Sequence, residues 1–122
     1  MKNSTQEYFS SVAGKVPPKK RKRVYIASPY TKGDVAINVR KQITTFTILL
    51  DEGYIPFAPL RSHFIHLVNP QSYDTWMQWD LDWLDTCDIV LRLEGESEGA
   101  DKEVARAKEK GIKVVYGLKE LL

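Results

Sequence analysis

Short apolar, strand-like runs alternate with helix-like segments along most of the chain. The runs lie at residues 24–27, 54–58, 88–93 and 112–116. Strands that alternate with helices pair in parallel through crossover connections. The alternation therefore predicts an α/β fold, a three-layer sandwich of the Rossmann-like or flavodoxin-like kind with a mainly parallel sheet of four to five strands.

Between these runs we expect three helices, at residues 35–52, 73–86 and 98–110. Asp34 can cap the first helix and Gly53 can end it, whereas residues 60–72 are expected to form a long loop. The apolar positions of the first helix are Ile37, Ile43, Phe46, Leu49 and Leu50.

Ligands of open parallel sheets bind beyond the carboxyl ends of the strands, near the point where the strand order reverses. In this chain those ends are the segments 28–33, 58–66 and 93–99. We therefore expect the functional residues to lie in these three segments and on the helices beside them.

The charge divides the chain into a basic arm, residues 1–22, and a domain, residues 23–122. Residues 1–23 carry seven Lys or Arg and one acid, whereas residues 24–122 carry eleven Lys or Arg and fifteen acids. A mildly acidic domain argues against a nucleic-acid surface spread over it, so a nucleic acid would be bound only through the basic run 19–23. The segment 17–24 resembles a short nuclear-import signal, but a match this short favours a solvated charge run.

The length of 122 residues is enough for one domain with its own core. The single cysteine, Cys87, excludes an internal disulfide framework and a multi-cysteine zinc site. No apolar run approaches the roughly 18 residues of a membrane span, and the N-terminus has no secretory apolar region. We therefore expect a soluble, cytoplasmic protein without a membrane partner.

Asp80 breaks the amphipathic pattern of the expected helix 73–86, which carries the three tryptophans of the chain. On a helical wheel it lies in the middle of the aromatic face, near Trp76 and Trp83, whereas the other acids of this helix lie opposite. A buried carboxylate costs several kcal/mol unless it is paired or protonated, and burial raises its pKa toward that of a general acid. The alternative is a structural carboxylate that caps a loop or pairs with an arginine such as Arg61. Both interpretations stay open at this point.

Glu103 lies beside the buried stripe of the helix 98–110, within its first two turns. Most helix glutamates at such a position are ordinary boundary residues. The strand-to-helix turn before it, however, offers an anion the backbone N–H groups of a helix N-terminus and the hydroxyl of Ser97. Ser97 can also be a simple N-cap, and that role does not exclude a ligand.

Three blocks in this order resemble the nucleoside 2-deoxyribosyltransferase-like superfamily, including its branch of nucleoside 5′-monophosphate N-glycosidases. The resemblance covers residues 24–117. The blocks are Tyr25-Ile-Ala-Ser-Pro-Tyr30, Asp80-x-x-x-Leu84-x-x-Cys87-Asp88 and Ser97-x-Gly99-x-x-x-Glu103.

The resemblance implies that Glu103 attacks the anomeric carbon of a nucleotide or nucleoside, and that Asp80 helps the base to leave. One carboxylate must then be ionised and the other must carry a proton. Water releases the sugar, or a second base captures it. Neither a metal nor a cofactor is implied.

The resemblance, together with the polar residues of the chain's own segment 60–72, indicates the substrate-binding residues. A serine at the place of Ser97 is typical of the monophosphate branch, where it binds the 5′-phosphate, whereas the nearby acids Glu94, Glu96 and Glu98 would repel phosphate unless they face solvent. The loop residues His63 and His66 are expected to line the pocket rather than to hold a metal. The predicted substrate-binding set is Tyr25, Ser28, Pro29, Tyr30, Thr31, Arg61, His63, Ser97 and Gly99.

Members of the superfamily are dimers or larger, so we expect a homodimer or a higher homo-oligomer. The three tryptophans are expected in the core or in that interface. The alternative functions are a non-catalytic nucleotide-binding or sensing module of the same fold, and an interaction domain that its basic arm delivers to nucleic acid.

Overall fold

The computed structural model of the protein describes residues 21–122, so residues 1–20 of the predicted basic arm lie outside the described part of the chain. In chain order the elements are β1 (Arg23–Ala27), α2 (Val35–Asp51), β2 (Ile55–Phe57), the 3-10 turn η2 (Pro59–Arg61), α3 (Ser62–Val68), α4 (Tyr73–Leu84), β3 (Ile89–Arg92), α5 (Glu98–Glu109), β4 (Lys113–Tyr116) and the 3-10 turn η3 (Leu118–Leu121).

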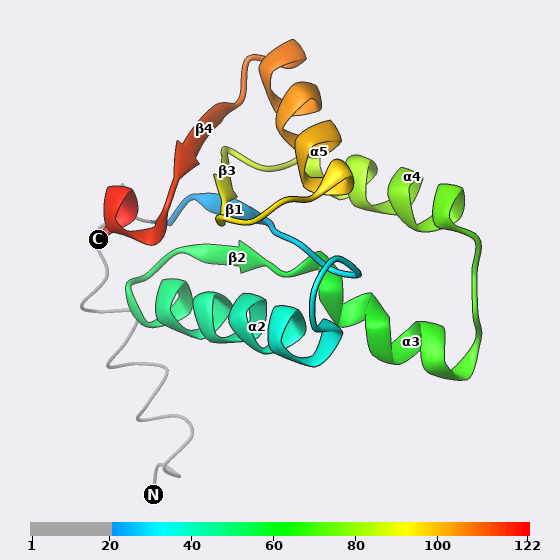
Figure 1. The fold of residues 1–122 in the computed structure, drawn as a ribbon. Helices are drawn as coiled ribbons and strands as arrows, with labels where there is room; N and C mark the ends of the chain where they lie inside the picture. Colours follow the sequence, from blue (N-terminus) through cyan, green and yellow to red (C-terminus); the bar gives the residue numbers. More distant parts are fainter. Residues whose placement is uncertain (1–20) are drawn as a thin grey trace, which may run out of the picture.

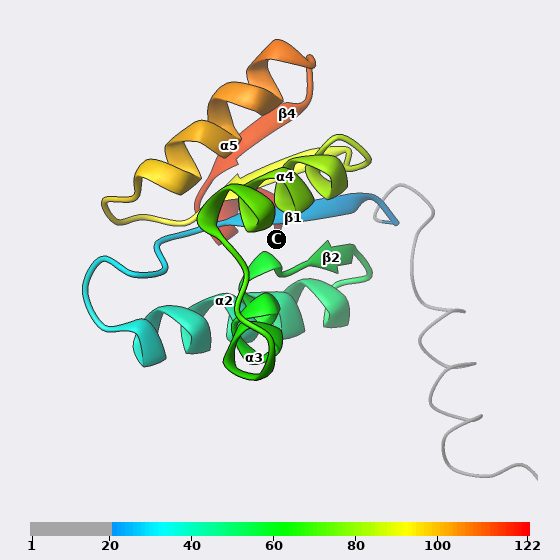
Figure 2. The same cartoon turned by 90° about the vertical axis from the view of Figure 1, so that its right-hand side faces the viewer.

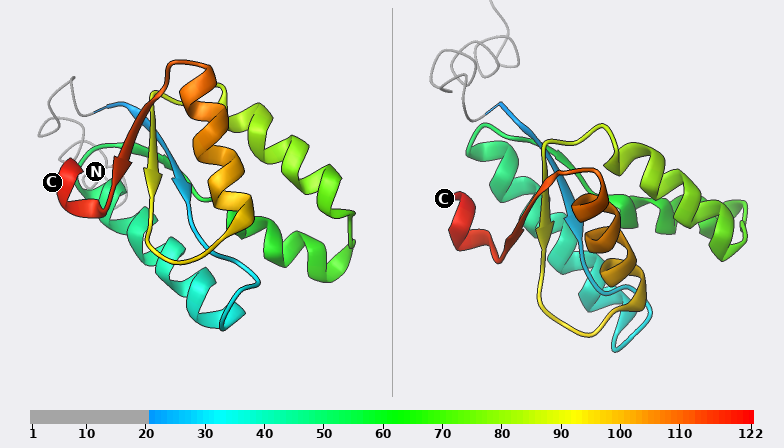
Figure 3. Two further views of the ribbon diagram at one scale, coloured as in Figure 1. Left: turned by 45° about the horizontal axis from the view of Figure 1, so that its top comes forward. Right: turned by 90° about the horizontal axis from the view of Figure 1, so that it is seen from above.

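The four strands between residues 21 and 122 form one parallel sheet in the order β2-β1-β3-β4 (Figures 1 and 3). The register pairs Tyr25 of β1 with Phe57 of β2 and with Val90 of β3. The strand order reverses between β1 and β3, so a ligand site is expected at their carboxyl ends. The predicted Rossmann-like α/β class is confirmed, with four strands.

Helices cover both faces of the sheet and make three layers (Figure 2). Alternate residues of β1 point to opposite faces, because side chains alternate along a strand. Val24 and Ile26 pack with Leu49 of α2 and Leu121 of η3. On the other face, Tyr25 and Ala27 pack with residues of α4 and α5, among them Leu84, Ala100 and Ala107. No helix within residues 21–122 has the length and apolarity to cross a bilayer.

Side-chain caps define where three helices begin. Asp34 accepts a hydrogen bond from the N–H of Ile37, and Ser72 and Ser97 cap α4 and α5 in the same way. Gly53, which follows α2, has a φ of +95°, a left-handed conformation that glycine adopts without strain. The boundaries of the three predicted helices therefore follow from local sequence.

The predicted loop 60–72 is wrong over most of its length. Pro59 opens η2, since its fixed φ suits a first helical position, and α3 follows directly. This segment gave no periodic signal because α3 buries none of its residues. Its large apolar side chains are exposed, namely Phe64, Ile65, Leu67 and Val68.

The buried face of α2 also differs from its most apolar positions. Of those positions, Leu49 is buried and Phe46 partly buried, but the remaining three, Ile37, Ile43 and Leu50, are between 38% and 46% exposed. The residues that α2 buries are Val39, Gln42, Thr45 and Leu49. Two of the four are polar, which is why an apolar count places the face incorrectly.

The three tryptophans of α4 are only partly in the core. Trp76 and Trp79 are half-buried, whereas Trp83 is 43% exposed and stacks on Phe57 at a ring-centroid distance of 5.2 Å. Cys87 is buried, and burial raises the pKa of its thiol to about 11, so the thiol stays protonated near neutral pH.

Candidate functional site

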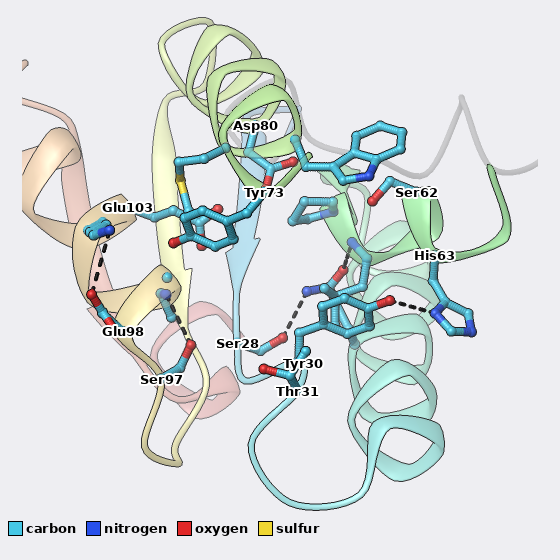
Figure 4. A pocket seen from close by; sticks show the side chains of 18 of the residues that line it. Ser28, Tyr30, Thr31, Ser62, His63, Tyr73, Asp80, Ser97, Glu98 and Glu103 are labelled. Carbon is cyan, nitrogen blue, oxygen red and sulfur yellow. Dashed lines mark hydrogen bonds and ion pairs between the residues drawn. The ribbon is translucent and has the colours of Figure 1, made fainter. Parts of the chain in front are cut away.

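A cavity of about 600 Å³ opens at the carboxyl ends of the strands, where sequence analysis expects a ligand (Figure 4). The loop after β1, the segment η2–α3, the helix α4 and the first turns of α5 all contribute to its wall. The lining residues used below are Ser28, Tyr30, Thr31, Lys32, Gln42, His63, His66, Tyr73, Trp76, Asp80, Ser97, Gly99, Lys102 and Glu103.

Glu103 is a buried carboxylate in the wall of this cavity, with 5% of the residue exposed. The small residues Ala100 and Ala107, which α5 buries, allow this helix to pack closely on the sheet. The hydroxyl of Tyr25, from the adjacent strand β1, donates a hydrogen bond to Glu103 Oε2. Glu103 is therefore a buried residue positioned by a tyrosine, and it does not lie at the boundary between the buried and exposed sides of α5.

Burial raises the pKa of Glu103 to about 8. The hydrogen bond from Tyr25 lowers that pKa, the charge of Asp80 raises it, and the guanidinium of Arg92 lowers it. The pKa of the Tyr25 phenol is raised well above its usual range, first because the residue is buried and then because Glu103 lies beside it. The phenol therefore remains protonated and acts as a donor. The Glu103 carboxylate can thus carry either a proton or a charge near neutral pH.

Asp80 projects from α4 into the same cavity (Figure 4). Burial raises the pKa of its carboxyl to about 7. Asp80 Oδ1 is buried and has no hydrogen-bond partner among the described residues. The alternative that Asp80 pairs with Arg61 does not hold, because the Arg61 guanidinium lies 4.7 Å over the ring of Phe57. An orphaned, protonatable carboxyl facing a cavity is available to a ligand.

The turn from β3 to α5 supplies polar groups to the cavity. Ser97 caps α5 by accepting a hydrogen bond from the N–H of Ala100 at 3.1 Å, and it also lines the cavity. Gly99 lies in the first turn, where an added Cβ would meet the Met77 side chain at 3.5 Å. Arg92 braces the turn by donating to the carbonyls of Leu93 and Gly95 and to Asp101.

The loop after β1 divides its predicted binding residues between two cavities. Tyr30 and Thr31 line the main cavity, Pro29 lines a neighbouring one of about 250 Å³, and Ser28 lines both. Gly95 has a φ of +117°, and a Cβ there would lie 2.7 Å from the Pro29 ring. Only glycine at this position lets the two loops approach each other so closely.

The helix α3 forms the far wall of the cavity with its two histidines. The hydroxyl of Tyr30 and Nδ1 of His63 are 2.6 Å apart. Nδ1 of His66 accepts hydrogen bonds from the Trp76 indole at 3.0 Å and from the N–H of Gln71 at 3.2 Å, so its ring proton lies on Nε2. Arg61, which was predicted to read the base or sugar, is not among the lining residues.

Two lysines at the cavity rim each pair with an exposed glutamate. Lys32 lies 2.9 Å from Glu96, and Lys102 lies 3.6 Å from Glu98. Both glutamate side chains are at least 79% exposed, although Glu98 also belongs to the wall of the main cavity and Glu96 to that of the neighbouring one. Such exposed pairs contribute little to stability and can exchange partners when an anion binds.

Several lining residues were not predicted from the sequence, above all Gln42. Gln42 could have been found, because Val39, Gln42 and Leu49 share one face of α2 at helical spacing. Tyr73 also lines the cavity, and the ammonium of Lys102 lies 5.3 Å from its ring centroid. The contact between Tyr25 and Glu103 joins positions 78 apart, which no local pattern reveals.

Comparison with curated proteins found no match. A family model does match, over nearly the whole described part of the chain, and its description names no activity. Residues 22–117 match the model "Domain of unknown function (DUF7768)", and the chain belongs to that family.

Proposed function

We propose that this protein cleaves the N-glycosidic bond of a nucleoside 5′-monophosphate or a nucleoside, with Glu103 as nucleophile and Asp80 as proton donor. The observation that carries the proposal is the pair of carboxyls, both with a pKa raised into the neutral range, that face one cavity at the carboxyl ends of β1 and β3. Perturbed carboxyls in a cleft are typical of acid–base and nucleophilic sites.

The chemistry needs one charged and one protonated carboxyl. A Glu103 oxygen forms a bond to the anomeric carbon while the bond from that carbon to the base nitrogen breaks. The electron pair of the broken bond stays on the base, and the Asp80 proton neutralises it. A sugar ester of Glu103 results, as in retaining glycosidases.

The second step returns both carboxyls to their starting forms. Water attacks the anomeric carbon, the ester bond to Glu103 breaks, and Asp80 takes up a proton of the water. If a second base attacks instead, the sugar is transferred and Asp80 accepts the proton of that base. Both outcomes use the same two residues, so they differ only in which nucleophile enters the cavity.

The proton must lie on the right one of the two carboxyls. The productive form carries the proton on Asp80 and the charge on Glu103. Burial raises the pKa of Asp80 to about 7 and that of Glu103 to about 8, so the two carboxyls compete for one proton near neutral pH. The hydroxyl of Tyr25 raises the share of the productive form by stabilising the Glu103 carboxylate.

The resemblance to the nucleoside 2-deoxyribosyltransferase-like superfamily supports the same reaction. Its monophosphate branch is favoured by Ser97 at the N-terminus of α5, with Ser28 and Thr31 opposite. The charges of the exposed Glu96 and Glu98 are each offset by a paired lysine, which reduces their repulsion of a phosphate. We therefore propose a 5′-phosphorylated substrate.

We further propose that the protein is a homodimer or a larger homo-oligomer in the cytoplasm. The exposed apolar side chains of α3, with Leu67 at 67% and Val68 at 76% exposure, support a second copy at this helix. Light scattering of the wild type and of Leu67→Ser tests this. A monomeric wild type would contradict it.

The experiment is a chromatographic assay of free base with ribo- and deoxyribonucleoside 5′-monophosphates and the matching nucleosides. Glu103→Gln and Asp80→Asn are compared with two controls that change exposed acids of the same helices, Glu109→Gln and Asp82→Asn. We expect the controls to match the wild type and the first two variants to lose activity. Binding without cleavage by the wild type would instead favour a nucleotide-sensing module.

A further inference from the structure

Gln42 is a fully buried glutamine in the middle of α2, and it joins three parts of the cavity wall. Its Nε2 donates to the carbonyl of Ile26 at 3.1 Å and to the hydroxyl oxygen of Ser28 at 2.8 Å. Its Oε1 accepts from the backbone N–H of Leu60 at 2.8 Å. The residue therefore ties α2 to the end of β1 and to η2.

These partners fix the orientation of the side-chain amide. The Leu60 N–H can only donate and the Ile26 carbonyl can only accept, so the amide oxygen must face Leu60 and the amide nitrogen must face Ile26. The nitrogen has a second proton, and it goes to Ser28. Reversing the amide would break both backbone bonds in a buried place.

The fixed amide sets the polarity of the Ser28 hydroxyl. Because the Ser28 oxygen accepts from Gln42, the Ser28 proton must point elsewhere, and no acceptor for it is found among the described residues. Ser28 lines the cavity (Figure 4). A hydroxyl that is held as a donor favours a ligand oxygen that carries no proton, and a phosphate oxygen is of this kind.

We infer that Gln42 is a positioning residue that holds the Ser28 hydroxyl as a hydrogen-bond donor for a phosphate oxygen of the ligand. This inference deepens the proposed function and rests on it for the identity of the ligand. The polarity of Ser28, however, is a property of the unliganded protein. It can therefore be tested separately from catalysis.

The first experiment is a neutron diffraction structure of the unliganded protein. We expect the two deuterons of Gln42 Nε2 to point to the Ile26 carbonyl oxygen and to Ser28 Oγ, and the Ser28 deuteron to point into the cavity. A Ser28 hydroxyl that donates its deuteron to Gln42, or to any other protein atom, would overturn the inference. This result does not depend on whether the protein cleaves a nucleotide.

The second experiment measures calorimetric binding of deoxyribonucleoside 5′-monophosphates and of the matching nucleosides, in a Glu103→Gln background that prevents cleavage. We expect Ser28→Ala and Gln42→Met each to weaken monophosphate binding about tenfold, and the double variant to be no weaker than either. Nucleoside binding should change less. The control is Thr45→Val, which alters another buried polar residue of α2 that does not line the cavity.

If Gln42→Met does not fold, Gln42→Glu replaces it, because a carboxylate still accepts from Leu60 but cannot donate to Ser28. The Ser28 hydroxyl then turns toward position 42, and monophosphate binding weakens. Unchanged monophosphate binding in the Gln42 variants, or effects that multiply in the double variant, would overturn the inference. If the wild type binds none of these probes and releases no base, the proposed function fails, and the diffraction result alone decides the role of Gln42.

Discussion

The two faces of the sheet differ in what they bury. On the α2 side, Val24 and Ile26 of β1 contact apolar residues that serve packing alone. On the α4–α5 side, their neighbour Tyr25 donates to Glu103, a buried ionisable group. Both faces come from one five-residue strand, so the alternation of side chains separates the face that carries Glu103 from a mainly apolar face, on which Gln42 contacts the cavity. The difference predicts that substitutions on the two faces affect different quantities.

Glu103→Gln is expected to have the largest effect, since it removes the nucleophile from the chemical face. Gln can still accept the Tyr25 hydrogen bond, so the fold should survive. We expect base release to fall at least about 10⁴-fold, measured as kcat/KM. Glu109→Gln on the exposed side of α5 is the control. A Glu103→Gln variant with a tenth of wild-type activity would contradict the nucleophile role.

Asp80→Asn should come next, because it removes the proton donor and leaves the nucleophile. General acid catalysis contributes roughly 10²- to 10⁴-fold, and the loss should be smallest for substrates whose base leaves readily without protonation. Rates for a series of bases with different leaving-group pKa values measure this. An equal loss for all of them would show that Asp80 does not protonate the base.

Leu49→Ala tests the packing face. Leu49 is fully buried between α2 and the sheet, so its truncation should lower the free energy of unfolding by about 2–5 kcal/mol. Denaturant titration measures the loss. The kcat/KM of the folded fraction should stay within about twofold of the wild type, because Leu49 does not line the cavity. A large loss of activity would show that packing on the α2 side also determines the geometry of the site, which would contradict the separation of the two faces.

The pH dependence of stability distinguishes the faces as well. The pKa of Glu103 is about 8 in the folded protein and 4.5 in its usual range, so the folded state holds a proton that the unfolded state has lost. The contribution of this group to stability is therefore present below about pH 4.5 and is lost as the pH rises to about 8. Glu103→Gln removes that dependence. Relative to the wild type it should gain stability on the order of a few kcal/mol between pH 5 and pH 8.

Tyr25→Phe and Tyr54→Phe form a matched pair across the sheet. The Tyr25 hydroxyl lowers the pKa of Glu103, so its removal should raise that pKa, shift the pH profile of kcat/KM and reduce activity at pH 7 about tenfold. The Tyr54 hydroxyl donates to the Leu121 carbonyl at 2.8 Å on the packing face. Its removal should cost about 1 kcal/mol of stability and leave the profile unchanged. Identical profiles for both variants would contradict the role of Tyr25.

The sequence predicted the sheet because the strand runs and the helix caps are local signals. The Asp34 and Ser97 caps lie where the sequence places them. The helix α3 was missed because it exposes its apolar residues and so shows no amphipathic pattern. The face of α2 was misplaced because Gln42 is buried for its hydrogen bonds rather than for its hydrophobicity.

The two carboxyls of the candidate site could be predicted from the sequence, but the residues that contact them could not. Asp80 was recognised as a charge on an aromatic face, and it lies in the cavity wall with its Oδ1 unpartnered. The partner of Glu103 depends on how α5 packs on β1, and that packing is tertiary. Arg61 has a charge suited to a ligand, but it covers Phe57 instead.

Detection of the sugar ester on Glu103 tests the central claim most directly. The wild type is mixed with a deoxyribonucleoside 5′-monophosphate, quenched in acid within milliseconds to seconds, and digested for mass spectrometry. We predict free base, together with a sugar-phosphate adduct on the peptide that contains Glu103, and neither product with Glu103→Gln. Base released equally by both proteins, or an adduct on another residue, would contradict the account.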